Sequence, residues 1–189
     1  MTQGGSVQSD KAQVRRACLA ARDASDPLAR AAASVRLFAR LRHLRGLVIA
    51  GYLPIGSEAS SVATMAALSR DNTLCVPVVT AKGAALRFRE WWPGCALETG
   101  AFGVSVPVEG GWRVPDLLIV PVVGFDASCA RMGYGGGFYD RTLAGLPAAT
   151  AIGLAVEAQR ADRIPLEPTD VHLHHVVTNA RVHSRGDVG

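Results

Sequence analysis

Apolar side chains recur at helical spacing in three stretches within the first 70 residues, and polar side chains occupy the other face of each stretch. In the second stretch the apolar face comprises Leu28, Val35, Leu37, Phe38, Leu41 and Leu44. Asp10 and Asp26 stand at positions typical of a helix N-cap, and Pro27 suits a first helical turn. The pattern predicts helices over residues 10–24, 27–45, 60–70 and, more briefly, 138–144.

Short, almost wholly apolar runs lie between these helices and are typical of strands that are buried on both faces of a sheet. Two further stretches, 85–91 and 171–178, also favour strands, the first because its apolar and polar residues alternate. We predict strands over residues 47–54, 73–79, 85–91, 116–125, 150–156 and 171–178. Residues 93–115 are rich in Gly and Pro, which predicts a long ordered loop.

Helices that alternate with buried strands favour an α/β protein, here a three-layer α/β/α sandwich around a mainly parallel or mixed central sheet. We expect a single domain over residues 1–189, with a core at about 10–180 and disordered tails at both ends. Apolar residues make up 49% and charged residues 19%, and no apolar run is long enough to cross a bilayer. The first residues lack the pattern of a secretory signal, so we expect a cytoplasmic protein.

The formal net charge of +4 is a mild excess that suits anionic small molecules. It is far from the dense basic stripe of a nucleic-acid binder, so we expect small-molecule partners, no nucleic acid, no membrane, and a monomer. His172, His174 and His175 could mark a metal site, but a solvated or mixed strand face is the favoured interpretation. The cysteines lack Cys-x-x-Cys spacing and are expected to be reduced, mostly buried thiols: Cys18, Cys75, Cys95 and Cys129.

The sequence RMGYGGGFYDR at residues 131–141 carries the strongest chemical signal. Glycines that follow a strand and precede a helix let backbone N–H groups approach a phosphate closely. The spacing matches neither a Walker A loop nor the Rossmann pattern, so by spacing alone a tight surface turn is an equal alternative. Asp140 favours the functional interpretation, because a carboxylate beside a phosphate calls for a hard cation such as Mg²⁺. The segment therefore predicts a Mg²⁺–nucleotide site, with Arg131 and Arg141 as charge partners.

This segment resembles the signature of the 5-formyltetrahydrofolate cyclo-ligase family, R-L-G-x-G-x-G-F/Y-Y/F-D. The resemblance extends from Lys11 to Thr178. It includes an early K-x-x-x-R pair, GYLPIGSE, FREWWPGCALETGAFGVSVP, the strand before the signature, and RIPLEPTDVHLHHVVT. It implies a three-layer α/β/α fold and an ATP- and Mg²⁺-dependent enzyme that converts 5-formyltetrahydrofolate to 5,10-methenyltetrahydrofolate, ADP and phosphate. In the implied reaction, the γ-phosphoryl group activates the formyl oxygen and N10 then attacks the formyl carbon.

The resemblance also implies roles for individual residues. Those that match ATP-binding positions are Lys11, Arg15, Arg131, Gly133, Tyr134, Gly135, Gly136, Gly137, Phe138 and Tyr139. Those that match folate-binding positions are Leu53, Glu58 and Tyr134 to Phe138, to which we add Trp92 as a ring that could stack on the substrate. The implied catalytic residues are Arg131, Tyr134 and Asp140, and the implied metal ligands are Asp140 and Asp170.

Structural alternatives remain for several of these residues. Lys11 and Arg15 could face solvent, Glu58 could be an acid at the start of a helix, and Trp91 and Trp92 could simply pack. Arg87 and Arg89 could meet the folate glutamate tail or face water. His174 stands where the family often has an Asp, and Tyr134 stands where its members vary. The alternative function is a non-catalytic nucleotide- and folate-binding sensor or buffer, which the retained Lys11, Arg15, Asp140 and Asp170 disfavour.

Overall fold

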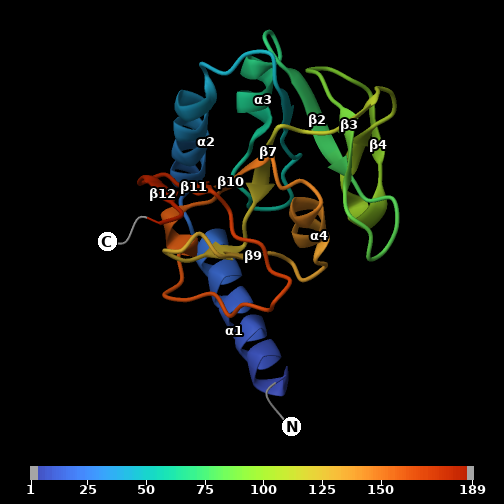
Figure 1. Ribbon diagram of the computed structural model, residues 1–189. Helices are drawn as coiled ribbons and strands as arrows, with labels where there is room; N and C mark the ends of the chain where they lie inside the picture. Colours follow the sequence, from blue (N-terminus) through green and yellow to red (C-terminus); the bar gives the residue numbers. More distant parts are fainter. Residues whose placement is uncertain (1–3, 187–189) are drawn as a thin grey trace.

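A mixed sheet with helices on both faces organises the structure, a computed structural model that describes residues 4–186 (Figure 1). The helices are α1 (Gly4–Asp23), α2 (Pro27–Leu41), α3 (Val62–Leu68) and α4 (Phe138–Ala144), with 3-10 turns at Ala101–Gly103 and Glu157–Gln159. The strands are β1 (Val48–Ala50), β2 (Thr73–Val78), β3 (Arg87–Glu90), β4 (Leu97–Thr99), β5 (Ser105–Pro107), β6 (Trp112–Arg113), β7 (Leu117–Pro121), β8 (Gly124–Phe125), β9 (Arg131–Met132), β10 (Thr150–Leu154), β11 (His175–Val177) and β12 (Val182–Ser184).

Within the described residues the main sheet has the strand order β12-β11-β10-β7-β1-β2-β3-β6. The central strands β11, β10, β7, β1 and β2 are parallel, and antiparallel strands flank them at both edges. The chain runs from β1 outward to β6 and then returns to place β7 on the other side of β1. The connection that follows β1 and the connection that follows β7 therefore leave toward opposite sides of the sheet. Ligands in open α/β sheets bind beyond the carboxyl ends of the strands at such a point.

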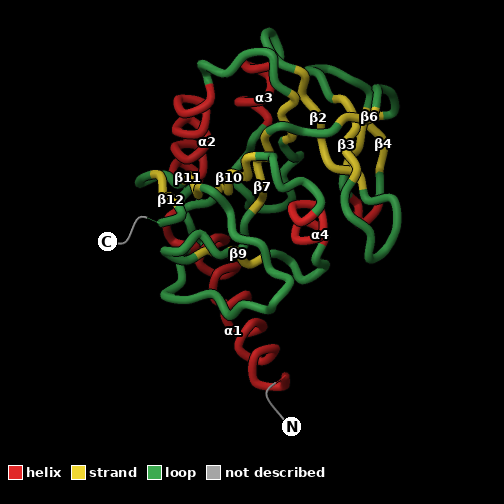
Figure 2. Tube along the Cα trace, viewed as in Figure 1, coloured by secondary structure: helices red, strands yellow, loops and turns green. Residues whose placement is uncertain are grey.

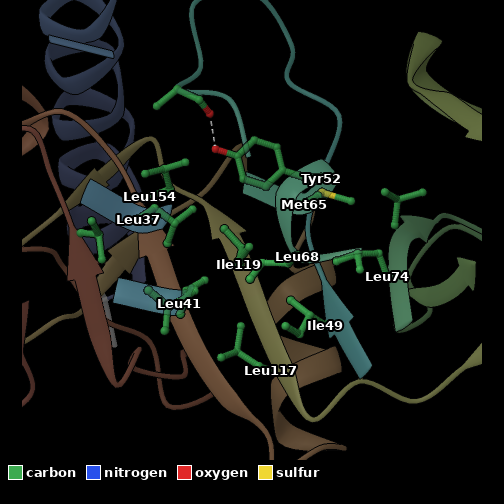
Figure 3. Packing of buried hydrophobic residues seen from close by; sticks show 14 of the residues in the cluster. Leu37, Leu41, Ile49, Tyr52, Met65, Leu68, Leu74, Leu117, Ile119 and Leu154 are labelled. Carbon is green, nitrogen blue, oxygen red and sulfur yellow. Dashed lines mark hydrogen bonds between the residues drawn. The ribbon is translucent and has the colours of Figure 1, made fainter. Parts of the chain in front are cut away.

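Successive residues of the central strands point to opposite faces, and each face has its own helices. On one face Ile49, Leu117 and Ile119 join a buried cluster with residues of α2 and α3. Figure 3 shows the two helices contributing Leu37, Leu41, Met65 and Leu68 to this cluster. On the other face Ala50 and Leu118 pack in a cluster that includes Leu143 of α4. The expected three-layer α/β/α sandwich with a mainly parallel sheet is confirmed.

α1 lies outside these two layers and packs against the β8–β9 ribbon. Cys18 of α1 is buried with Val123, Ala130 and Met132. Figure 2 shows that α1 and β9 lie at an end of the molecule that is built largely of loops. α1 therefore reaches the same end of the sheet as the glycine-rich segment. No helix in the described part of the chain is both long and apolar enough to cross a membrane.

The helix boundaries differ in part from the prediction. α1 begins at Gly4, so Asp10 lies inside the helix and is not its N-cap. Asp26 does cap α2, since its side chain accepts a hydrogen bond from the Leu28 N–H at 2.8 Å. α2 ends at Leu41, four residues before the predicted end, and α3 is also shorter than predicted.

The predicted apolar face of α2 is only partly correct. Leu37 and Leu41 are buried in the core, where Ala33 joins them, whereas Leu28 and Val35 are 75% and 68% exposed. A small alanine faces the sheet because it lets the helix approach closely. Hydrophobic type alone did not reveal which apolar side chains the sheet covers.

The strand prediction missed several short elements. Residues 93–115 contain β4, β5 and β6 instead of one loop, and β6 extends the main sheet by pairing with β3. The last predicted strand, 171–178, is reduced to β11, and β12 lies within the expected C-terminal tail. Of the tails expected outside residues 10–180, the parts at 1–3 and 187–189 lie outside the described residues. Short strands of two or three residues carry too little periodicity to be recognised from sequence.

The contrast between Leu37 and Val35 can be tested by truncation. We expect Leu37→Ala to lower the free energy of unfolding by about 2–5 kcal/mol, because it leaves a cavity under the sheet. Val35→Ala on the same helix is the control and should change it by less than about 0.5 kcal/mol. Urea denaturation measures both values, and equal losses would contradict the orientation of α2.

Candidate active site

A groove of about 1490 Å³ opens beyond the carboxyl ends of β1 and β7, at the switch point of the sheet. Its walls come from α1, the segment after β1, the β4–β5 region, the glycine loop (residues 133–137), α4, and residues 167–171. Among the described residues that line it are nearly all the sequence-predicted site residues: Lys11, Arg15, Leu53, Glu58, Arg131, residues 133–140 and Asp170. Residues from opposite ends of the chain thus meet in one groove.

The glycine loop adopts a backbone that glycine makes possible. Gly135 and Gly137 have φ angles of +99° and +64°, in the region that side chains disfavour. A Cβ on Gly137 would lie 2.7 Å from Nη1 of Arg141. Two arginines donate to carbonyls of the loop, Arg15 to Gly133 at 2.9 Å and Arg141 to Gly136 at 2.6 Å. The loop is therefore held by cations whose charge also faces the groove.

Arg131 and Asp140 form an ion pair at the base of this loop. Nη2 of Arg131 donates to Oδ1 of Asp140 at 2.8 Å, and the Arg131 side chain is 4% exposed. The same carboxylate oxygen accepts the backbone N–H of Val171 at 3.1 Å. Nε of Arg131 is buried without a hydrogen-bond partner among the described residues. The pair joins β9, α4 and the C-terminal loop, and it uses one of the two Asp140 oxygens.

Lys11 and Asp170 form the second ion pair of the groove. Nζ of Lys11 lies 2.6 Å from Oδ2 of Asp170 and 3.5 Å from Oε1 of Glu167. Asp170 also accepts the N–H of Glu167 at 2.8 Å, which fixes the loop. Lys11 is thus mostly buried in an ion pair, and the solvent-facing alternative for it is wrong.

The two candidate metal ligands, Asp140 and Asp170, line the same groove on adjoining segments. The described residues contain no group of three or more His, Cys, Asp or Glu side chains that could hold a metal ion by themselves. This donor set fits Mg²⁺ better than Zn²⁺, because Mg²⁺ commonly takes one or two carboxylates and completes its shell with substrate phosphates and water.

Glu58 also lines the groove. Its carboxylate accepts the Ile55 N–H at 2.8 Å and the Tyr134 hydroxyl at 2.9 Å, and Nη1 of Arg22 lies 3.8 Å away. Burial raises the pKa of Glu58, and the two hydrogen bonds and the Arg22 charge oppose that rise. In both hydrogen bonds the Glu58 carboxylate is the acceptor.

Arg22 is 5% exposed and was not among the predicted site residues. Its guanidinium donates to Ser57 at 3.0 Å and to the Tyr134 hydroxyl at 2.9 Å. A signal was present, because Lys11, Arg15 and Arg22 follow one another at spacings of four and seven, which puts them on one face of α1. The basic residues of this helix were predicted to lie on the face opposite its apolar residues, and only Lys11 and Arg15 among them were given a role.

Phe102 was also missed. It lines the groove with a φ of +57°, and its ring meets Phe138 edge-on, with centroids 5.9 Å apart.

The tryptophans and arginines around β3 lie in different environments, and none of them lines the groove in the part of the chain that the structure describes. Trp91 is buried in the core, in agreement with the packing alternative. Trp92 is 43% exposed and is absent from the described residues that line the groove. Arg87 and Arg89 stack on the Trp112 ring at 4.0 and 5.6 Å, and neither lines the groove. Trp92 and these arginines thus lie outside the described lining of the groove, and their folate-binding roles stay predictions.

Two other expectations can be compared with the structure. Nδ1 of His174 accepts the backbone N–H of Ala151 at 3.0 Å, so this ring satisfies a backbone donor of the central strand β10 just before β11 begins, and it does not line the groove. All four cysteines are free thiols, and all except Cys95 are buried, as expected.

Comparison with known proteins gives consistent results. The sequence profile of the 5-formyltetrahydrofolate cyclo-ligase family matches residues 7–179. A 5-formyltetrahydrofolate cyclo-ligase of Mycolicibacterium smegmatis is 35% identical over 150 residues, which cover 73% of this chain and 76% of that protein. An Escherichia coli protein of the same name is 42% identical over 69 residues, 35% of this chain and 38% of its own.

Solved structures agree with the fold. The 5,10-methenyltetrahydrofolate synthetase of Aquifex aeolicus superimposes with a TM-score of 0.78 at 27% identity, over 95% of this chain and 94% of that chain. A 5,10-methenyltetrahydrofolate synthetase of Mycoplasma pneumoniae superimposes with a TM-score of 0.70 at 23% identity, over 90% of this chain and 99% of that chain, and supports the fold alone.

The Arg131–Asp140 pair predicts a stability difference between two substitutions. Asp140→Ala leaves a buried guanidinium without its anion, so we expect a loss of about 3 kcal/mol in unfolding free energy. Asp140→Asn keeps an oxygen that accepts from Arg131 and Val171 and should cost less. Urea denaturation compares them, with the exposed Asp162→Ala as control. An Asp140→Ala protein as stable as the parent would show that the pair contributes nothing.

Proposed function

Because the chain belongs to the 5-formyltetrahydrofolate cyclo-ligase family, we propose that it closes the ring of 5,10-methenyltetrahydrofolate from 5-formyltetrahydrofolate with ATP and Mg²⁺. The observation that carries the proposal is the two-ended groove at the switch point. One end has cations, a glycine loop and two carboxylates, which suit Mg²⁺–nucleotide. The other end has a buried carboxylate, Glu58, which suits the N–H donors of a pterin.

At the nucleotide end, Lys11, Arg15 and Arg131 would bind the phosphates. They come from α1 and β9 and converge on the glycine loop. Asp140 and Asp170 would hold Mg²⁺, which neutralises charge on the transferred phosphoryl group when bound. Because α4 has only seven residues, the cations and the loop backbone supply most of the attraction for phosphate.

At the folate end, Glu58 would accept hydrogen bonds from the amino group and ring N–H of the pterin. A carboxylate has about four lone-pair sites, and Ile55 and Tyr134 occupy two of those on Glu58. Leu53, Phe102 and Phe138 supply apolar surface for the rings. The glycine loop lies between the two ends, so both substrates would meet at its backbone.

The reaction proposed here needs positioning more than a protein nucleophile. Transfer of the γ-phosphoryl group to the formyl oxygen turns a poor leaving group into phosphate, and N10 then attacks the formyl carbon. The described residues that line the groove include no Cys and no His. Their cations and backbone groups suit a step that depends on charge neutralisation and alignment.

A direct assay tests this proposal. We expect purified protein with 5-formyltetrahydrofolate, Mg²⁺ and ATP to generate the methenyl chromophore, and omission of ATP to abolish it. Binding of both ligands without ATP-dependent product would favour the sensor or buffer function instead. A lack of both binding and product would overturn the proposal.

Asp140→Asn tests the role of that carboxylate. We expect the rate to fall by about 100-fold or more with the fold retained, because the amide replaces a charged metal ligand. Asp162→Asn, an exposed acid outside the groove, is the matched control and should retain activity. Turnover of Asp140→Asn near the parent rate would remove Asp140 from the metal site.

Glu58→Gln tests the folate end separately from the nucleotide end. The amide keeps the size of the side chain but presents donors to a pterin amino group, so we expect the KM for 5-formyltetrahydrofolate to rise by about tenfold. The KM for ATP should stay within about twofold. An equal rise in both values would indicate a general disturbance of the groove.

A further inference from the structure

We propose that Arg22 is a positioning residue that holds Glu58 ionised and oriented for the folate through the Tyr134 hydroxyl and Ser57. This inference rests on the proposed function. Arg22 does not line the groove, so it acts through the residues that do. It lies in the last turn of α1, seven positions after Arg15 of the nucleotide end.

The geometry is a relay of hydrogen bonds. Nη1 of Arg22 donates to the Tyr134 hydroxyl at 2.9 Å, and that hydroxyl donates to Oε1 of Glu58 at 2.9 Å. Nη1 of Arg22 is also 3.8 Å from the same carboxylate oxygen. The Arg22 and Glu58 side chains are 6% and 4% exposed, so water does little to screen their attraction.

A second set of contacts fixes the guanidinium itself. Nε of Arg22 donates to Oγ of Ser57 at 3.0 Å, and Ser57 in turn donates to Asp23. Ser57 directly precedes Glu58, so the backbone that carries the carboxylate is tied to the end of α1. Cζ of the Arg22 guanidinium also lies 5.8 Å from the centroid of the Tyr134 ring, and this contact further restricts the orientation of the two groups.

The charge balance explains why this cation matters. Arg22 is the cation close to Glu58 among the described residues, and the Tyr134 hydroxyl is the other side chain that lowers the pKa of Glu58. The Glu58 charge in turn raises the pKa values of three phenols, which come from the end of β1, the glycine loop and α4: Tyr52, Tyr134 and Tyr139. Without Arg22, a buried carboxylate surrounded by phenols would protonate more readily.

Protonation would damage the folate end. A neutral carboxylic acid presents an O–H donor where the pterin also presents donors, so one of the paired hydrogen bonds is lost. Burial already raises the pKa of Glu58, and the ionised form is lost as the pH falls through that pKa. Removal of the Arg22 charge raises the pKa further, so this loss begins at a higher pH.

The test is the KM for 5-formyltetrahydrofolate of Arg22→Met relative to that of the parent protein, measured with saturating Mg²⁺–ATP from about pH 5.5 to about pH 8.5. The ratio removes any titration of the substrate. We expect the KM of Arg22→Met to be about tenfold that of the parent near neutral pH, and this ratio to grow as the pH falls. The midpoint of the rise in KM with falling pH should lie about one pH unit higher for Arg22→Met than for the parent. Arg22→Lys should restore part of the affinity.

Three comparisons separate this role from a structural one. The KM for ATP of Arg22→Met should stay within about twofold of the parent value. Arg16→Met, an exposed arginine of the same helix, should leave both KM values and the pH profile unchanged. If Arg22→Met does not fold, Tyr134→Phe removes the bridging hydroxyl without removing a buried charge, and a smaller shift in the same direction is expected. Where both fold, the double variant should be no weaker in folate binding than Arg22→Met alone.

The outcomes are distinct. An inactive parent protein that also fails to bind 5-formyltetrahydrofolate would contradict the proposed function. An active parent with an Arg22→Met profile that superimposes on it, or with equal rises in both KM values, would overturn the role of Arg22 alone. Fully additive effects of Arg22→Met and Tyr134→Phe would likewise overturn the relay.

Discussion

The return of the chain from β6 to the other side of β1 is the constraint on which the site depends. It places β7 beside β1 with connections that leave in opposite directions, and the groove opens where those connections part. The segment after β1 then supplies Glu58, and the segment after β7 supplies the glycine loop. Without this reversal the two segments would be separated by several strands, and one groove could not hold both.

Balanced charge is the second property of the groove. Asp140 is paired with Arg131, and Asp170 is paired with Lys11, so each candidate metal ligand already has a cation beside it. Under the proposed function, Mg²⁺–ATP brings a cation for the carboxylates and anionic phosphates for the arginine and lysine. Ligand binding would therefore exchange ion pairs, and little net charge would be buried in the exchange, which limits the desolvation cost.

Long, regular or strongly capped elements were predictable. The buried central strands were recognised because apolar residues run through both faces, and the fourth helix was predicted at residues 138–144, where α4 lies. Asp26 was recognised as a cap because its contact is local. Asp10 was wrongly taken as a cap because α1 begins earlier, at Gly4. The exposure of Val35 and the short strands β4 to β6 were not predicted, since each depends on what another segment covers or pairs with.

The sequence alone predicted the candidate chemistry: the glycine loop with Asp140 behind it, the basic residues of α1, and the resemblance that covers most of the chain. These are local patterns, and spacing along the chain is enough to reveal them. Which charges meet is visible only in the folded structure. Lys11 pairs with Asp170 across 159 positions of the chain. Arg22 reaches Glu58 through the hydroxyl of Tyr134, which comes from a distant segment of the chain. Such partners depend on how the strands are ordered in space, which no local pattern encodes.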